Sequence, residues 1–392
     1  MRTLYISYNG ALDSLGQSQV LPYLRELRQD GHVITLLTFE RRANSVAARA
    51  VSLRREMSKW GLGWTWLWYH KRPPVISTLW DLARGVLVTF WLAIRHNVQA
   101  LHARSQVSAA MVWPVARLLR RRFIFDLRGQ MAYEYADGGT WREGGLLYRL
   151  VERAERRFIK DADAIVVLTH TLADDLKCVS GQPPVVIPTC VDLEVFGPLT
   201  HAARSPRMVY CGSLGARYAP DLLVHFYLAA ARAMPSLDLL ILTHSDPSAV
   251  KTLLADAAAP EGRCTFLQVS HREVPKHLAS GSFGVLLLQG NRSLRGACPT
   301  KVAEYLAAGL PVVSSPGIGD LNILLPRERV GVVLQDHSQA SIAEGVAQLT
   351  ELLSEGEALR VRCRGVAERE YSLAGAGGPS YRALYRDVEA RL

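Results

Sequence analysis

Short apolar runs rich in β-branched residues alternate with amphipathic stretches along almost the whole chain. Buried parallel strands and their connecting helices produce this alternation, so the pattern predicts an α/β protein built from βαβ units. The helix predicted over 17–29 has apolar residues at helical spacing and ends at Gly31. The predicted strands are 3–8, 33–39, 100–103, 123–127, 164–168 and 185–188, followed by 208–211, 237–242, 264–269, 284–288, 311–314 and 331–334.

The alternation is interrupted once, by a short polar segment at 197–206 that has the composition of an interdomain linker. A chain of 392 residues is also too long for one ordinary core. We therefore predict two domains, 1–196 and 207–375, and a last helix over 379–392. Sheets of this kind bind ligands at the carboxyl ends of their strands, which predicts a cleft faced by both domains.

Composition indicates a well-packed globular protein, since 49% of the residues are hydrophobic and 21% are charged. The six cysteines show no CxxC pair and no metal-ligand spacing. The first residues read as a strand rather than a signal peptide. The longest apolar stretch, Gly85 to Ile94, has only ten residues, which is too short to span a bilayer. We expect a cytoplasmic protein, soluble or peripheral on the inner face of a membrane.

Positive charge is concentrated in residues 1–200, which carry 26 Lys and Arg against 18 Asp and Glu. This favours an anionic partner, although a solvated basic surface explains it equally well. No nucleic-acid-binding signature is present, so we expect no nucleic-acid partner. The tryptophans at 64, 66 and 68 share one face if they lie in a strand. They predict either a core strand or, together with the cations at 120–122 and 153–160, a surface for anionic membranes.

The segment PTKVAEYLAAGLPVV at 299–313 is the most informative, because Pro299 suits the start of a helix and Gly309 suits its end. Such a helix N-terminus can bind a diphosphate. Lys301 in the first turn disfavours the helix unless an anion lies opposite, and Glu304 can accept hydrogen bonds from two adjacent ribose hydroxyls. A surface Lys–Glu pair is the alternative interpretation.

Polar residues end two neighbouring strands of the N-terminal domain. His102 and Arg104 end one strand, and Asp126 and Arg128 end the next, at the edge where a site is expected. A lone histidine there is more often structural, but four polar residues together favour function. In the first loop, Gly16 either lets the backbone approach a phosphate or serves the turn alone.

Taken together, the chain resembles the family-4 retaining glycosyltransferases of the GT-B fold, also called glycosyl transferases group 1. The matching segments keep the family's order over nearly the full length: 14–40, 102–105, 125–141, 162–169, 186–196, 209–218, 272–279 and 299–313. The resemblance implies two Rossmann-like domains that face a cleft. It also implies that residues from about 376 to 392 pack back on the N-terminal, acceptor-binding domain, while the C-terminal domain binds a nucleotide sugar.

Within this resemblance, Glu304 matches the second acid of the family's paired-glutamate motif, which holds the ribose. Gly296 stands where the first acid is expected, so the contact to the donor sugar is unassigned. Candidate cations for the diphosphate are Arg217 and Lys301, which with His102 make up the catalytic prediction. The predicted donor-binding residues are Gly16, Ser213, Arg217, His271, Thr300, Lys301 and Glu304, and the predicted acceptor-side residues are His102, Arg104, Asp126, Arg128 and Glu134.

The resemblance implies transfer from a nucleoside-diphosphate sugar to a sugar or lipid-linked glycan, with retention, in surface polysaccharide or glycoconjugate synthesis. We expect neither metal nor cofactor. Asp161 and Asp163 have the spacing of a metal–diphosphate motif, but they lie where a helix enters a strand, which indicates a turn. Two alternatives stay open: a sugar-nucleotide epimerase of the same fold, and a non-catalytic nucleotide-sugar-binding protein.

Overall fold

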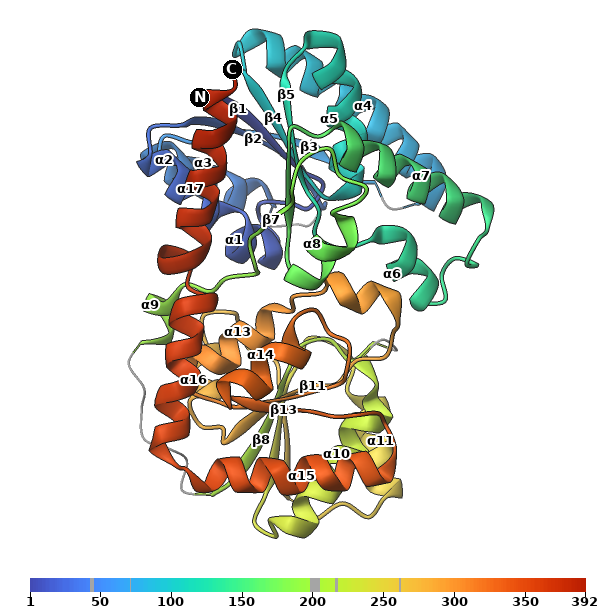
Figure 1. Cartoon of the computed structure of the whole chain (residues 1–392), viewed down its shortest axis with the longest axis vertical. Helices are drawn as coiled ribbons and strands as arrows, with labels where there is room; N and C mark the ends of the chain where they lie inside the picture. The colour runs from blue at the N-terminus through green and yellow to red at the C-terminus, as the bar shows by residue number, and fades with distance from the viewer. Residues whose placement is uncertain (43–45, 71, 198–204, 216–217, 261) are drawn as a thin grey trace. The chain divides into compact units, whose positions relative to one another are not determined.

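The computed structural model describes the chain except for residues 43–45, 71, 198–204, 216–217 and 261 (Figure 1). The chain divides into two compact units. The N-terminal unit comprises 1–136, 141–188 and 376–392, and the C-terminal unit comprises 137–140 and 189–375. Each unit is built on its own parallel sheet, which confirms the predicted pair of Rossmann-like domains.

The N-terminal unit contains a seven-stranded parallel sheet with the order β3-β2-β1-β4-β5-β6-β7. Its strands are β1 (Arg2–Ser7), β2 (Val33–Glu40), β3 (Gly63–Trp68), β4 (Ala100–Arg104), β5 (Arg122–Asp126), β6 (Ala164–Val167) and β7 (Val185–Val186). Its helices are α1 (Ser14–Gln19), α2 (Leu21–Gln29), α3 (Val46–Lys59), α4 (Pro74–Arg95), α5 (Ser105–Leu119), α6 (Met131–Asp137), α7 (Leu146–Asp161), α8 (His170–Leu176) and α17 (Gly378–Ala390).

Helices cover both faces of this sheet, so its central strands are buried on both sides and read as continuous apolar runs. All five residues of β4 are buried. On one face, α5 packs between α4 and α7. On the other face, α17 packs against α2.

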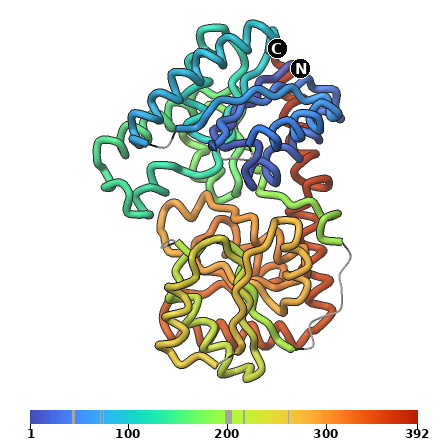
Figure 2. The backbone as a smooth tube through the Cα atoms, turned by 180° about the vertical axis from the view of Figure 1, so that it is seen from behind, coloured from blue at the N-terminus to red at the C-terminus, as the bar shows by residue number. Residues whose placement is uncertain are grey.

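The last helix completes the N-terminal unit, as the resemblance predicted. Arg382 on α17 pairs with Glu26 on α2 at 2.6 Å, and the amino group of Met1 pairs with Glu389. The two chain ends therefore lie side by side, as Figure 2 shows from behind.

The C-terminal unit contains a six-stranded parallel sheet with the order β10-β9-β8-β11-β12-β13. Its strands are β8 (Arg207–Cys211), β9 (Asp238–Leu242), β10 (Cys264–Leu267), β11 (Phe283–Leu286), β12 (Val312–Ser314) and β13 (Gly331–Val333). Its helices are α9 (Leu193–Phe196), α10 (Pro220–Ala233), α11 (Ser248–Asp256), α12 (Val274–Leu278), η2 (Arg292–Gly296), α13 (Thr300–Ala307), α14 (Leu321–Glu328), α15 (Gln339–Ser354), α16 (Glu357–Glu370) and η3 (Leu373–Gly377). Two buried clusters, one rich in α13 and α16 residues and the other in α10 and α15 residues, form its core.

The predicted strands are all present, with ends shifted by one or two residues. The helix predicted over 17–29 is wrong in one respect, because the chain breaks at Val20, where φ is −122°, and divides it into α1 and α2. The tryptophan run forms the edge strand β3 beside β2. Trp64 is buried and its indole N–H donates to the Thr38 hydroxyl at 2.9 Å, as the core interpretation predicts, whereas Trp66 and Trp68 are only half-buried.

The ten-residue apolar stretch proves to be only part of α4. Its segment Val75–Arg95 has 21 residues and is long and apolar enough to cross a membrane by length and composition. In the part of the chain that the structure describes, it is the one helix that meets this criterion, and 28% of its most apolar window is buried. The expectation that no apolar stretch reaches spanning length is therefore wrong.

Candidate functional site

The C-terminal sheet has its topological switch point between β8 and β11. From β8 the chain moves outward through β9 and β10, and it then returns to build β11, β12 and β13 on the other side. Open α/β sheets bind ligands at the carboxyl ends of the strands beside such a point, because the loops diverge there. The candidate site therefore lies where Gly212 follows β8 and α13 follows β11.

Lys301 lies in the first turn of α13, and its buried ammonium has no hydrogen-bond partner among the described residues. The Nζ atom lies 4.5 Å from the ring centroid of Tyr210 and 4.6 Å from that of Tyr218. Two aromatic faces stabilise a cation without neutralising it. Burial still disfavours the charged form and lowers the pKa of Lys301 to about 8. A buried cation of this kind is suited to an anionic ligand.

Glu304 lies one turn further along α13 and is also buried. Burial raises the pKa of its carboxyl group, while His271 and Lys301 oppose that rise. Its Oε1 lies 3.8 Å from Nδ1 of the half-exposed His271. Because Lys301 and Glu304 are both buried, the alternative of a surface Lys–Glu pair is wrong. The structure brings these three predicted residues together, with the half-buried Thr300 beside Lys301.

The loop after β8 approaches Lys301 closely because it begins with glycine. Gly212 has a φ of +142°, and a β-carbon at this position would lie 2.7 Å from Nζ of Lys301. Any other residue would strain the backbone and press on the ammonium group. Ser213 follows on the surface, and its carbonyl oxygen accepts a hydrogen bond from the Tyr210 hydroxyl. Arg217, the other predicted cation, lies outside the described residues.

The sequence patterns do not single out Tyr210, Tyr218 and Gly212 as neighbours of Lys301. All three lie in the segment 209–218, which resembles the family as a whole. The signal for these neighbours in the sequence is the pair of aromatic residues that flank a glycine at the end of a predicted strand. The end of α13 is as predicted, since Gly309 has a φ of +76° just beyond the helix.

The four polar residues that end β4 and β5 also come together, but beneath α17 instead of at an open surface. His102 and Asp126 are completely buried. Nδ1 of His102 lies 2.9 Å from the Tyr385 hydroxyl, and the Tyr381 hydroxyl donates to Asp126 at 2.9 Å. Arg128 donates in turn to the Tyr381 hydroxyl at 3.1 Å.

Attraction between buried charged groups stabilises this cluster. Burial works against the Asp126 carboxylate, but Arg128, His102 and Arg104 outweigh it and hold its pKa well below the usual range. Burial lowers the pKa of His102, although Asp126 opposes that change. The geometry favours a structural role for this cluster, which ties α17 to the sheet. Catalysis by His102 and acceptor binding by the cluster stay predictions.

Gly16 and Glu134 lie elsewhere in the N-terminal unit. Gly16 is buried inside α1, where a β-carbon would come within 2.2 Å of the Gly10 carbonyl oxygen. This contact favours the turn-geometry interpretation of that glycine. Glu134 lies on α6, and a β-carbon on Gly129 would come within 2.2 Å of its carboxylate. Its carboxylate therefore lies beside the loop after β5.

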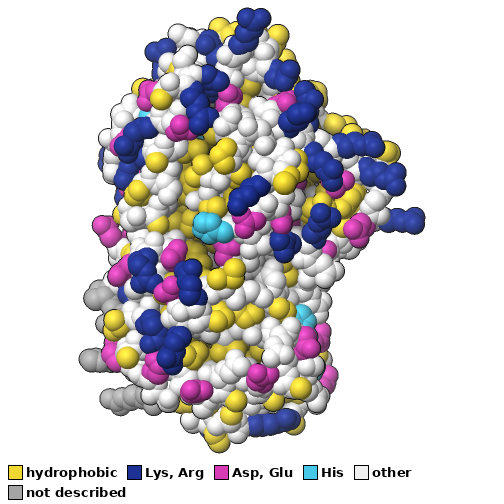
Figure 3. Space-filling view, viewed as in Figure 1, with side chains coloured by type: hydrophobic (Ala, Val, Ile, Leu, Met, Phe, Trp, Pro, Cys, Tyr) yellow, Lys and Arg dark blue, Asp and Glu magenta, His cyan; other side chains and the backbone are white. Residues whose placement is uncertain are grey.

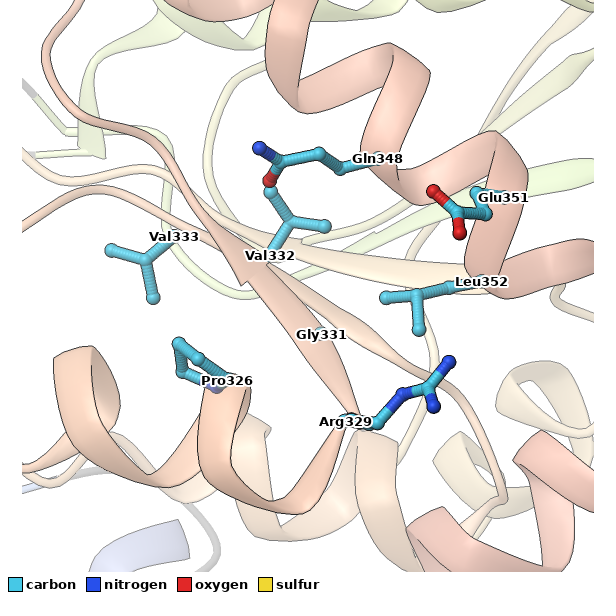
Figure 4. A pocket seen from close by; sticks show the side chains of 8 residues that line it. All are labelled: Pro326, Arg329, Gly331, Val332, Val333, Gln348, Glu351 and Leu352. Atoms are coloured by element: carbon cyan, nitrogen blue, oxygen red, sulfur yellow. The ribbon is translucent and has the colours of Figure 1, made fainter.

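One pocket of the C-terminal unit lies apart from these residues. It lies between α14, β13 and α15 and is lined by Pro326, Arg329, Gly331, Val332, Val333, Gln348, Glu351 and Leu352 (Figure 4). None of these is a predicted site residue. A second pocket, in the N-terminal unit, is lined by Gln99, Arg120, Arg121, Arg122, Asp163 and Leu392. Within the described ranges, no group of three or more His, Cys, Asp or Glu side chains could hold a metal ion.

Solved structures share the fold of the whole chain. Sucrose-phosphate synthase from Thermosynechococcus elongatus superposes with a TM-score of 0.78 and 16% identity, covering 100% of both chains. Anabaena HepE in complex with UDP-glucose gives a TM-score of 0.70 and 13% identity over 98% of this chain and 100% of that one. WaaG, a glycosyltransferase involved in lipopolysaccharide biosynthesis, gives 0.64 and 12% over 97% and 99%. The fold is that of the GT-B glycosyltransferases.

Family models assign the chain more narrowly. Residues 16–190 match the glycosyl transferase 4-like domain, and residues 205–351 match the glycosyl transferases group 1 domain. The chain belongs to the group 1 glycosyltransferases. Among curated proteins, no match was found.

Proposed function

We propose that the protein transfers a sugar from a nucleoside-diphosphate sugar to a hydroxyl group of a sugar or lipid-linked glycan. The observation that carries this proposal is the buried ammonium of Lys301, held between two tyrosine rings without a hydrogen-bond partner among the described residues. A diphosphate oxygen would accept the hydrogen bonds that this ammonium group lacks. Glu304 lies one turn away, where it can accept hydrogen bonds from a ribose diol. The complex of HepE with UDP-glucose supports this class of donor.

The reaction forms a bond from the acceptor oxygen to the anomeric carbon and breaks the bond from that carbon to the phosphate oxygen. The nucleoside diphosphate leaves with the electron pair, and the acceptor proton passes to its phosphate. The largest demand is stabilisation of charge on this leaving group. Lys301 and the N-terminus of the eight-residue helix α13 meet that demand. We propose that the acceptor attacks from the face that the diphosphate leaves, so that the anomeric configuration is retained. We propose that neither a metal nor a cofactor takes part.

The donor sugar itself meets backbone instead of a carboxylate at the position of Gly296. This residue ends η2 and is buried. We propose that peptide groups around 296–298 bind the sugar hydroxyls there. Because the family's first acid is missing, the non-catalytic alternative keeps specific support: a protein that binds the donor without transferring it.

We assign acceptor binding to the N-terminal unit and the product to surface polysaccharide or glycoconjugate synthesis. The role of WaaG in lipopolysaccharide biosynthesis supports this assignment. It predicts that turnover of the donor depends on an added glycan acceptor. An epimerase of the same fold would interconvert the sugar nucleotide without any acceptor.

The first test is a thermal-shift screen against UDP, GDP, dTDP, CMP and their sugar conjugates, with and without EDTA. We expect one nucleoside diphosphate to stabilise the protein selectively, with no change on adding EDTA. Glu304→Ala should lose most of this stabilisation. Glu351→Ala, at the separate pocket of the same unit, is the matched control and should keep it.

Three results would overturn parts of the proposal. Absence of stabilisation by every nucleotide would remove the donor site. Selective binding without turnover in the presence of glycan acceptors would favour the non-catalytic alternative. Loss of binding in EDTA would contradict the metal-free mechanism.

A further inference from the structure

The outward face of α4 is apolar from end to end. Its exposed residues recur at helical spacing and, apart from Arg95, are all apolar: Val75, Ile76, Leu79, Trp80, Ala83, Leu87, Trp91, Ile94 and Arg95. Ile76 and Leu87 keep 67% and 69% of their surface exposed. A helix of 22 residues is about 33 Å long, so this stripe is a continuous strip of that length. Exposed apolar patches of this extent mark interaction surfaces.

Three polar side chains of α4 point inward instead. Ser77, Asp81 and Thr89 are buried. The Asp81 carboxylate lies 2.6 Å from Nδ1 of His70 and accepts a hydrogen bond from the Tyr8 hydroxyl at 3.0 Å. These bonds fix the orientation of α4 on the N-terminal unit, so its apolar stripe faces outward because the polar face is used for anchoring.

Packing supports the same orientation. A β-carbon on Gly85 would lie 2.4 Å from the Met111 sulfur atom, so α4 and α5 approach closely at this point. A bilayer-spanning α4 would have to break this contact and place Asp81 in hydrocarbon, which is costly. The stripe is therefore suited to a helix that lies in the plane of an interface.

Positive charge lies on the helices next to the stripe. Between residues 75 and 122, Asp81 is the only acidic residue, and it is buried. The neighbouring helices α5 and α7, with the residue that follows α5, expose these cations: Arg117, Arg120, Arg149, Arg153, Arg156, Arg157 and Lys160. Of these, Arg156 pairs with Glu152, and both Arg117 and Arg157 pair with Asp161, so the acidic partners in all three ion pairs lie on α7. Figure 3 shows Lys and Arg side chains in blue over the region of α7, with some Asp and Glu in magenta among them and hydrophobic side chains in yellow beside them.

We propose that the outward face of α4, with the cations of α5 and α7, is a docking surface for an anionic lipid bilayer. The apolar side chains enter the boundary between headgroups and acyl chains, where Trp80 and Trp91 are favoured. The arginines contact lipid phosphates. Charge complementarity favours this partner. The apolar strip and the cations lie on neighbouring helices of the same layer, and an anionic membrane offers both an apolar interior and negative headgroups. The surface is independent of the donor site.

The test is flotation of the full chain with phosphatidylcholine vesicles, with and without about one third phosphatidylglycerol. We expect binding to the anionic vesicles and much weaker binding to the neutral ones. Leu87→Ser with Trp91→Ser should weaken binding about a hundredfold. The matched control, Ile323→Ser with Val361→Ser, removes two exposed apolar side chains of the C-terminal unit and should bind like the wild type.

Charge is tested in the same way. Arg149→Glu with Arg153→Glu should weaken binding to the anionic vesicles about tenfold or more. The control, Arg25→Glu with Arg55→Glu, makes the same change in net charge on α2 and α3 and should have little effect. Thermal unfolding and nucleotide binding of every variant are measured in parallel, so failure of this proposal is distinguished from failure of the donor site.

Four results would overturn the proposal. The first is that the wild-type protein does not bind anionic vesicles. The second is that Leu87→Ser with Trp91→Ser floats with these vesicles like the wild type. A lipid-free dimer that becomes monomeric in Leu87→Ser with Trp91→Ser would make the stripe an interface between two copies. Resistance to alkaline carbonate extraction from membranes would make α4 a spanning helix.

Discussion

At the scale of single residues, the proposed role of Lys301 predicts that nucleotide binding depends on pH. Its pKa of about 8 lies below the ordinary value, so the side chain loses its proton as pH rises through that range. A diphosphate binds the protonated form, and we therefore expect its affinity to fall about tenfold per pH unit above pH 8. Isothermal titration calorimetry with the preferred nucleoside diphosphate measures this slope.

Two variants of the same residue serve as controls for this slope. Lys301→Arg should bind with little dependence on pH, because a guanidinium group stays charged. Lys301→Met should bind weakly at every pH. Without ligand, the wild type should gain stability between about pH 8 and pH 10, since the unfolded chain binds more protons there than the folded one. An affinity that stays constant through this range would contradict the assigned role.

The position of Gly212 beside Lys301 predicts a second effect at the proposed donor site. In Gly212→Ala, a side chain is forced onto a φ of +142° and toward Nζ of Lys301. We expect a loss of about 1 kcal/mol in stability together with most of the nucleotide affinity. Gly317→Ala, at a φ of +77° with open space around it, should lose similar stability but keep the affinity. Urea unfolding and nucleotide titration of both variants distinguish strain from displacement of the lysine.

At the scale of elements, α17 is held to the sheet by hydroxyl groups. In Tyr381→Phe, the hydrogen bonds to Asp126 and Arg128 are lost, which should cost about 1–3 kcal/mol because these partners are charged. Tyr135→Phe, on an exposed side chain of α6, should change little. Urea unfolding measures the difference, and equal stabilities would show that α17 docks mainly through its apolar residues.

The same cluster makes the N-terminal unit sensitive to acid. The pKa of Asp126 lies well below its ordinary value, so its contribution to stability is present above about pH 4 and is lost as pH falls. The lowered pKa of His102 acts in the same direction from about pH 6.5 downward, because protonation is easier in the unfolded chain. We expect the contribution of this cluster to thermal stability to fall between about pH 6.5 and pH 3. His102→Gln should weaken the upper part of this dependence.

The N-terminal unit also depends on α17 as a whole. Residues 1–188 expressed alone should aggregate, because the partners of Tyr381, Leu384, Tyr385 and Val388 would be exposed. The same residues followed by a flexible linker and 376–392 should be soluble. Gel filtration of the two proteins checks this expectation, and a monomeric, folded 1–188 would contradict it.

At the scale of the whole molecule, both sheets could be predicted from the sequence, because strands buried on two faces read as apolar runs between amphipathic helices. The site on α13 was also predictable, since its helix signals and charges lie within one short segment. The burial of His102 was not, because its partner Tyr385 lies 283 residues away. Nor was the outward face of α4, since an apolar stripe normally faces inward and only contacts such as that of Asp81 with His70 reveal its direction.

The membership of α17 in the N-terminal unit also orders events on the ribosome. Domains usually complete folding from the N-terminus as the chain emerges. Here the first 188 residues must wait for the last 17, while residues 189–375 can close first. At ordinary translation rates of about 10 residues per second, that delay is about 20 s. During this delay the ion cluster around Asp126 is not yet covered by α17. The N-terminal unit of a nascent chain, although it is synthesised first, therefore stays incompletely folded the longest.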